Sequence, residues 1–147
     1  MIAPASVIDG ARKVHDFLTV GAPAPLQEAA VTALNFPDGY YDGLCHLYTE
    51  KRDFFIKGLD AIGLKYTYPK GAYYVMVDIS EFGCPDDTVF CEWMTRVVGI
   101  AAVPGSSFFQ EDVRHLIRFH FAKKQETLGL ALERLSSLRE KASGGIH

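Results

Sequence analysis

Apolar side chains recur at helical spacing along the first part of the chain. Residues 4–18 predict a first helix, because their apolar positions share one face: Val7, Ile8, Ala11, Val14, Phe17 and Leu18. Pro25 follows a segment rich in Gly and Pro, and its fixed backbone angle suits the first turn of a second helix through residues 26–34. This second helix is short and rich in Ala, so we expect it to pack closely against a large body.

A longer amphipathic pattern predicts one helix over residues 38–62. Asp38 suits its N-cap, and Gly63 suits its C-terminal stop. The apolar stripe of this helix comprises Tyr41, Leu44, Leu47, Tyr48, Phe54, Phe55, Leu59 and Ile62. A helix of this length is about twice the mean for globular proteins, and it is long enough to span two packed bodies.

From residue 65 onward the pattern changes to short apolar runs separated by turns. AYYVMVDI, residues 72–79, is a nearly continuous apolar run, which predicts a strand that is buried on both faces. The next helix starts at CPDD, residues 84–87, and ends at Gly99, with predicted buried positions Phe90, Trp93, Met94 and Val97. The other predicted elements are strands over 65–69, 100–103 and 115–121, and a closing helix over 125–141 that buries Leu128, Ala131, Leu132, Leu135 and Leu138. This order, α-β-β-α-β-β-α from residue 38, predicts an α/β fold of the α+β small-domain type. In it, a long N-terminal helix and shorter helices pack on a small sheet.

Composition and charge narrow the classes of function. The chain has 147 residues, 48% of them hydrophobic, which is enough for one domain with a real core. The net charge of -3 gives no electrostatic reason to expect nucleic acid or an anionic membrane as partner, and no apolar run approaches the length of a membrane-spanning helix. Three cysteines without CxxC spacing indicate reduced thiols in a cytoplasmic protein. The five histidines do not follow metal-ligand intervals, so no metal site is expected.

One arginine lies at the centre of the apolar stretch HLIRFHFAKK, residues 115–124. In a strand, Leu116, Arg118 and His120 share one side, whereas the large apolar residues take the other. A guanidinium among apolar neighbours needs an anionic partner. That partner is either an internal carboxylate, such as Asp78 or Glu92, or the carboxylate of a ligand, which a guanidinium fork matches in geometry and charge. The residue pattern alone does not separate these two interpretations.

Other candidate residues have simpler interpretations. PGSSFF, residues 104–109, is a tight turn whose amides could hold an anion, but it lacks nucleotide-binding spacing, so we interpret it as an ordered loop beside a pocket. His120 is interpreted as a hydrogen-bonded core residue, and Tyr73 and Tyr74 as core packing on a central strand. Asp78 is expected to cap the turn that follows its strand. Nothing marks a nucleophilic cysteine or a GxSxG elbow.

Three ordered motifs, "YPKGAYYVMVDIS", "GIAAVPGSSFF" and "HLIRFHFAKKQETLGLALERL", resemble the C-terminal small domain of pyridoxal-phosphate-dependent class I/II aminotransferases of fold type I. The upstream stretch "ARKVHDFLTVGAPAPLQEAAVTAL" is similar to the family segment that links the large domain to the long interdomain helix. Together these segments cover nearly the whole chain, in the family's order and at similar separations.

The resemblance implies a role for the central arginine. In that family the arginine at the position of Arg118 binds the α-carboxylate of the amino-acid or 2-oxo-acid substrate, and Phe108 matches an aromatic residue beside the substrate entrance. The resemblance also implies that residues 1–36 are the end of a large cofactor-binding domain and that residues 37–147 are the small domain. None of the eight lysines matches the Schiff-base lysine of the family. We therefore expect a C-terminal piece of a homodimeric enzyme, inactive alone, with pyridoxal 5'-phosphate bound only in the complete protein.

Two alternatives stay open at this point. The same carboxylate-binding arginine serves lyases, racemases and decarboxylases of the same fold. A stand-alone α/β domain that binds a carboxylate without catalysis also fits the residues.

Overall fold

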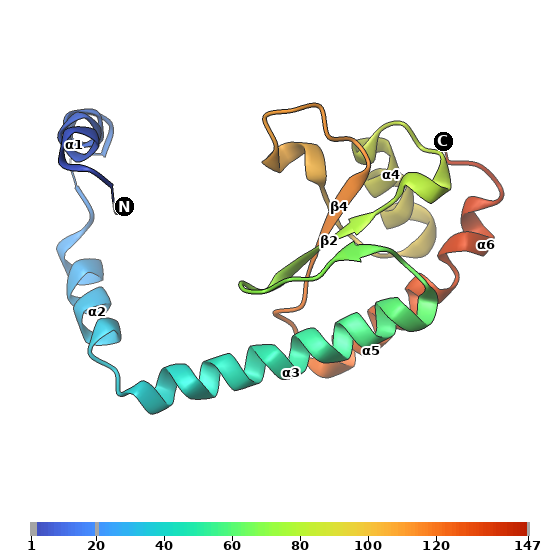
Figure 1. The fold of residues 1–147 in the computed structure, drawn as a ribbon, viewed down its shortest axis with the longest axis horizontal. Helices are drawn as coiled ribbons and strands as arrows, with labels where there is room; N and C mark the ends of the chain where they lie inside the picture. The colour runs from blue at the N-terminus through green and yellow to red at the C-terminus, as the bar shows by residue number, and fades with distance from the viewer. Residues whose placement is uncertain (1–2, 20, 147) are drawn as a thin grey trace. The chain divides into compact units, whose positions relative to one another are not determined.

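The computed structural model describes residues 3–19 and 21–146 (Figure 1). The chain divides into two compact units, Met1–Gly43 and Leu44–His147, and the division falls within one helix, α3 (Asp38–Ile62). The expected bounds of that helix are confirmed. Gly63, with a φ of 77°, ends it in the left-handed region that glycine adopts at low cost. No helix in the described ranges combines the length and the hydropathy that crossing a bilayer requires.

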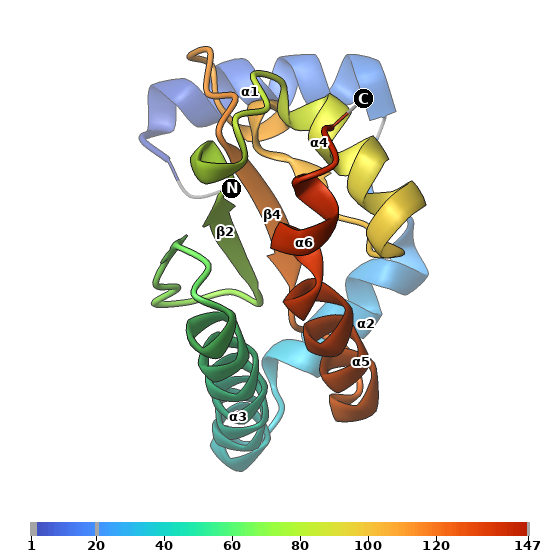
Figure 2. The same ribbon diagram turned by 90° about the vertical axis from the view of Figure 1, so that its right-hand side faces the viewer.

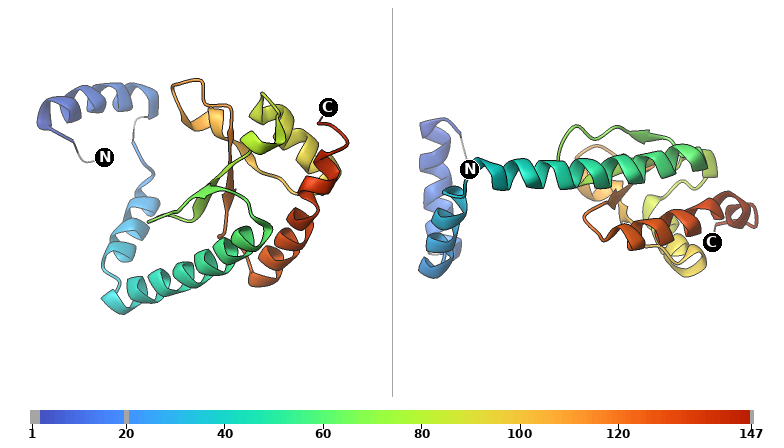
Figure 3. Two further views of the ribbon diagram at one scale, coloured as in Figure 1. Left: turned by 45° about the vertical axis from the view of Figure 1, so that its right-hand side comes forward. Right: turned by 90° about the horizontal axis from the view of Figure 1, so that it is seen from below.

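The first unit consists of α1 (Ala5–Thr19), α2 (Ala24–Leu34) and the first turns of α3 (Figure 3). The two short helices match the predicted ranges to within one or two residues. The Tyr41 hydroxyl donates a hydrogen bond to the Ala33 carbonyl and so ties the start of α3 to the end of α2. None of the described side chains of α1 and α2 is buried, so their apolar positions do not form a core within this unit.

The second unit is built on a four-stranded antiparallel sheet of order β1-β2-β4-β3. Figure 2 labels its two central strands, β2 and β4. The strands are β1 (Tyr66–Thr67), β2 (Tyr74–Asp78), β3 (Val103–Pro104) and β4 (Leu116–His120). The second half of α3 packs on one face of this sheet together with α4 (Asp87–Trp93), α5 (Gln125–Ser136) and α6 (Leu138–Ala142). The α/β small-domain fold expected from the element order is confirmed.

The core lies between that sheet face and the helices. Its fully buried side chains include Phe55 and Leu59 of α3, Phe90 and Met94 of the α4 region, Val75 and Val77 of β2, Ile117 of β4, and Leu135 and Leu138 of the closing helices. Gly58 lets α3 approach α5, because a Cβ there would lie 2.8 Å from Cγ of Leu132. The closing helix was expected to be continuous, but it breaks at Ser137, whose hydroxyl donates to the Arg134 carbonyl at 2.8 Å.

One side of β2 is not covered, contrary to the prediction of burial on both faces. Val75 and Val77 are buried, whereas Tyr74 remains 39% exposed, and Tyr73 beside it 50%. The core-packing interpretation of these two tyrosines is therefore wrong. The apolar run misled because the sheet is antiparallel, and an antiparallel sheet needs cover on only one face.

The α4 region also differs from its predicted helical spacing. After α4 the chain forms a π-helical turn over Met94–Val98, in which the Gly99 amide donates to the Met94 carbonyl, five residues earlier, at 3.0 Å. The wider turn moves the buried position by one residue. Val98 is buried, and Val97, the predicted core residue, is 45% exposed.

Candidate functional site

The uncovered sheet face places Arg118 at its centre. Arg118 lies on β4 opposite Met76 of β2, and its other neighbour across the ladder is Val103 of β3. Tyr74 and His120 form the next pair on the same face. Since β4 is hydrogen-bonded on both sides, the backbone that carries Arg118 is held firmly.

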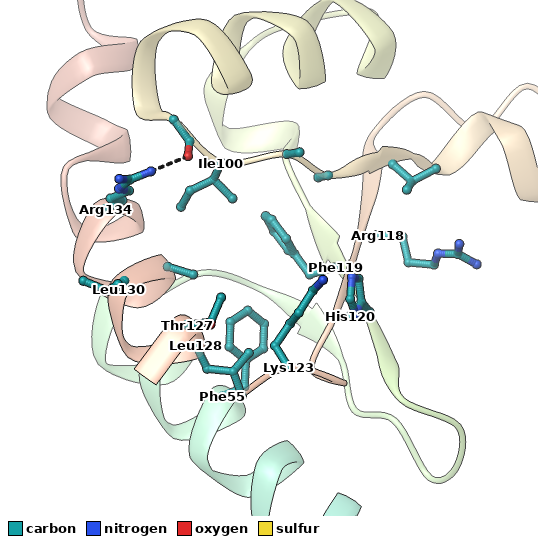
Figure 4. Close-up of a pocket in the computed structure, with 15 residues that line it drawn as sticks. Phe55, Ile100, Arg118, Phe119, His120, Lys123, Thr127, Leu128, Leu130 and Arg134 are labelled. Atoms are coloured by element: carbon teal, nitrogen blue, oxygen red, sulfur yellow. Dashed lines mark hydrogen bonds between the residues drawn. The ribbon is translucent and has the colours of Figure 1, made fainter. Parts of the chain in front are cut away.

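Two aromatic rings flank the guanidinium. Cζ of Arg118 lies 3.8 Å from the ring centroid of Phe108 and 4.8 Å from that of Tyr74. Stacking on the faces of aromatic rings is favourable for a guanidinium and leaves the N–H groups at its edge available. Figure 4 shows the Arg118 side chain extending away from the side of β4 on which Leu128 and Phe55 lie.

Neither of the internal carboxylates considered for Arg118 is its partner. Asp78 accepts hydrogen bonds from the hydroxyl and the amide of Ser80, at 2.5 and 2.8 Å, and these bonds lower the pKa of Asp78. The expectation that Asp78 caps the following turn is confirmed. Glu92 pairs with Arg96 at 3.3 Å. Within residues 3–19 and 21–146, no carboxylate oxygen lies within 4.0 Å of the Arg118 guanidinium.

Two cavities adjoin Arg118. The larger, of about 430 Å³, lies between β4, residues 99–103 and α5. The smaller, of about 190 Å³, is lined by residues of β2, β3 and β4 and by Tyr73. Arg134 also lines the larger cavity, but it donates to the Gly99 carbonyl at 2.7 Å (Figure 4). His120 lines both cavities and is exposed, so its interpretation as a core residue is wrong.

The loop that carries Phe108 is an ordered turn, as predicted. Its residues Gly105–Phe108 form a 3-10 turn, and Gly105 lies so close to Leu116 that a Cβ would come within 2.9 Å of the Leu116 carbonyl carbon. The Ser106 amide donates to the carboxylate of Asp87 at 2.7 Å. This amide is therefore already hydrogen-bonded within the protein and is not free to bind an anion. Sequence reasoning missed both Asp87 and the stacking of Tyr74, because each contact joins residues that are far apart in the chain.

The side chains around Arg118 do not match the requirements of pyridoxal 5'-phosphate. Lys123 is the one lysine among the residues that line the two cavities next to Arg118, and no Asp or Glu lines either cavity. A pyridoxal site needs a lysine for the aldehyde and a carboxylate for the ring nitrogen, so these side chains do not provide one. No group of three or more potential metal ligands occurs in the described ranges either.

The cysteines differ sharply in environment. Cys91 is buried on α4, and burial, together with the nearby negative charge of Asp87, raises its pKa to about 12. Because a raised pKa keeps a thiol neutral, and only the thiolate is nucleophilic, we expect iodoacetamide at pH 8 to alkylate the exposed Cys45 and to spare Cys91. Peptide mass spectrometry measures this, with the urea-unfolded chain as the control in which both react. Equal labelling of both in the native chain would contradict the burial of Cys91.

The chain is similar to known proteins along most of its length. The sequence model described as "Aminotransferase class I and II" matches residues 1–135. The methionine aminotransferase of Escherichia coli is 38% identical over 138 residues, which cover 93% of this chain and 36% of that protein. Kynurenine--oxoglutarate transaminase 1 of Mus musculus is 30% identical, with 93% of this chain and 38% of that protein covered. The chain thus spans little more than a third of the length of these relatives.

Solved structures give the same result. The N-succinyldiaminopimelate aminotransferase of Mycobacterium tuberculosis superposes with a TM-score of 0.79 at 35% identity, over 92% of this chain and 36% of that one. The sequence match and this similarity of fold agree with the resemblance carried by the three motifs. The chain belongs to the class I and II aminotransferase family, of fold type I.

Proposed function

We propose that this chain is the C-terminal part of a pyridoxal-phosphate-dependent aminotransferase and that Arg118 binds the α-carboxylate of its substrates. The surroundings of the Arg118 guanidinium support this role. It lies between two aromatic rings, on the side of β4 opposite Phe55 and Leu128, and no described carboxylate is its partner. Phe108, which stacks on it, is proposed as a substrate-binding residue as well.

The chemistry of transamination suits such a group. The amino-acid donor and the 2-oxo-acid acceptor both carry a carboxylate next to the reacting carbon. A guanidinium edge offers two parallel N–H donors to the two carboxylate oxygens. A permanently charged fork on a rigid strand would therefore bind both substrates and orient the same carbon each time, which is catalysis by positioning.

The remaining parts of the site are proposed to lie outside this chain. In this view, residues 1–36 are the end of the large domain and residues 37–147 are the small domain. The share of the relatives that the chain spans, little more than a third, supports the proposal that other parts of the site lie outside it. The apolar side chains of α1 and α2, unburied within their own unit, would pack against that large domain. Pyridoxal phosphate, held there, would supply the electron-withdrawing ring that amino-group transfer needs, in a homodimer of complete chains.

The amino acid that serves as donor is a separate question. The relatives are named for methionine, kynurenine and N-succinyldiaminopimelate. The feature that these substrates share is the amino-acid head group that Arg118 is proposed to hold. We therefore propose the substrate class, amino acids and 2-oxo acids, and no single donor.

A product assay tests the proposed function. In the complete protein loaded with pyridoxal phosphate, we expect a panel of amino acids with 2-oxoglutarate to yield glutamate and the matching 2-oxo acid in a 1:1 ratio. The 147-residue chain alone is the control and should form neither. Carbon dioxide or an elimination product formed without 2-oxoglutarate would assign a lyase or decarboxylase instead. Binding of the amino acid without any product would assign a non-catalytic carboxylate-binding domain.

A further inference from the structure

We propose that Asp87 is a positioning residue for the Arg118 site, because its buried carboxylate holds the turn that presses Phe108 against the guanidinium. This inference rests on the proposed role of Arg118. In this inference, Asp87 of α4 influences the affinity for substrate without contacting the substrate.

The burial of Asp87 is the first observation. It is fully buried, and among the described residues it is the one buried side chain that carries a charge. A carboxylate in such a place must have its oxygens satisfied. Both are used by one residue of the loop: the Ser106 amide donates to Oδ2 at 2.7 Å, and the Ser106 hydroxyl donates to Oδ1 at 3.0 Å.

The loop is tied to α4 at a second point. Asp86, the N-cap of α4, accepts from the amides of Thr88 and Val89. Its other oxygen, Oδ2, pairs with Arg114 at 2.9 Å. Two consecutive aspartates therefore hold the loop near its beginning, at Ser106, and near its end, at Arg114.

These ties bear directly on the arginine. Phe108 lies two residues after Ser106, and its ring centroid is 3.8 Å from Cζ of Arg118. Gly105, one residue before Ser106, lies against the backbone of Leu116, two residues before Arg118 on β4. Removal of the Asp87 carboxylate would free the turn while leaving β4 in place, so the ring would lose its fixed position on the guanidinium.

The expected kinetic effect follows from this geometry. In the complete enzyme, Asp87→Ala should raise KM for the amino-acid donor about tenfold and change kcat by less than about threefold, because the loss is in binding geometry. Asp87→Asn should restore most of the affinity, since its amide can still accept from the Ser106 N–H and donate to the Ser106 hydroxyl oxygen. Glu92→Ala removes an exposed carboxylate from the same helix and should leave KM unchanged.

A second measurement reports the stacking without activity. In the 147-residue chain, Cζ of Arg118 lies 3.8 Å from the centroid of the Phe108 ring, so the ring current should shift the Nε–H resonance of Arg118 upfield. Arg118→Lys identifies this signal by removing it. Phe108→Leu sets the unstacked position. Asp87→Ala should move the signal toward that position, and Asp87→Asn should not.

The outcomes separate this inference from the proposed function. If Arg118→Ala leaves kcat/KM unchanged, the carboxylate role itself is wrong. If Arg118→Ala lowers kcat/KM but Asp87→Ala changes neither KM nor the Arg118 resonance, the positioning role of Asp87 is wrong. Should Asp87→Ala fail to fold, Ser106→Ala decides. It removes one of the two donors, so it should raise KM about threefold and shift the same resonance, and wild-type values for both would overturn the proposal.

Discussion

Replacing Arg118 by alanine in the complete, cofactor-loaded protein should lower kcat/KM for amino-acid donors by about 30-fold or more. Loss of one partner of a desolvated, hydrogen-bonded charge pair costs about 2–5 kcal/mol, and each 1.36 kcal/mol is a factor of ten in rate. KM should rise strongly and kcat should fall, since the carboxylate would be held loosely and the reacting carbon would be misplaced. The absorbance of bound pyridoxal phosphate should not change, because Arg118 is not proposed to touch the cofactor.

Two variants sharpen this test. Arg118→Lys keeps the charge but loses the planar fork, so its kcat/KM should lie between those of the wild type and the alanine variant. Arg96→Ala removes an exposed arginine that pairs only with Glu92 across one helical turn, and it should leave kcat/KM unchanged. A loss below about threefold for Arg118→Ala would contradict the carboxylate-binding role.

Leu135→Ala should lower the free energy of unfolding by about 2–5 kcal/mol, the range for deletion of a buried leucine side chain. Leu135 is fully buried on α5, in the core between the helices and the sheet. Leu130→Ala is the matched control: the change and the helix are the same, but Leu130 is 58% exposed, and the expected cost is within about 0.5 kcal/mol. Urea unfolding followed by the fluorescence of Trp93, the single tryptophan and part of the same core, measures both. Equal costs for the two variants would mean that the buried face of α5 is assigned incorrectly.

Local patterns were sufficient to predict most helices and the strand that carries the site. Asp38–Ile62 has its predicted bounds because Gly63 ends it in the left-handed region and an apolar stripe runs along it. In β4 the alternation of side chains placed Arg118 on the face opposite Ile117 and Phe119, which are buried. Both predictions depend only on neighbours within a few residues, and such signals are present in the sequence itself.

The errors arose where distant parts of the chain decide the outcome. Whether β2 is covered on one face or on two depends on which helices pack against it, and this placed Tyr74 wrongly in the core. The π-helical turn buries Val98 in place of Val97, and the regular helical spacing of apolar residues does not predict such a turn. The bond between Asp87 and Ser106 spans 19 residues, and neither residue carries a local signal of the other.

The order of the strands has a consequence for how the site could diversify. β4 is bonded on both sides, to β2 and to β3, so the backbone of Arg118 has little freedom to adapt to the shape of a new molecule. The segment between Ser106 and Arg114 belongs to no ladder, and the side chains of these two residues tie its ends to Asp87 and Asp86. Under the proposed function, changes that fit donors of different bulk would then occur in that segment, while the proposed binding of the shared carboxylate by Arg118 would stay the same.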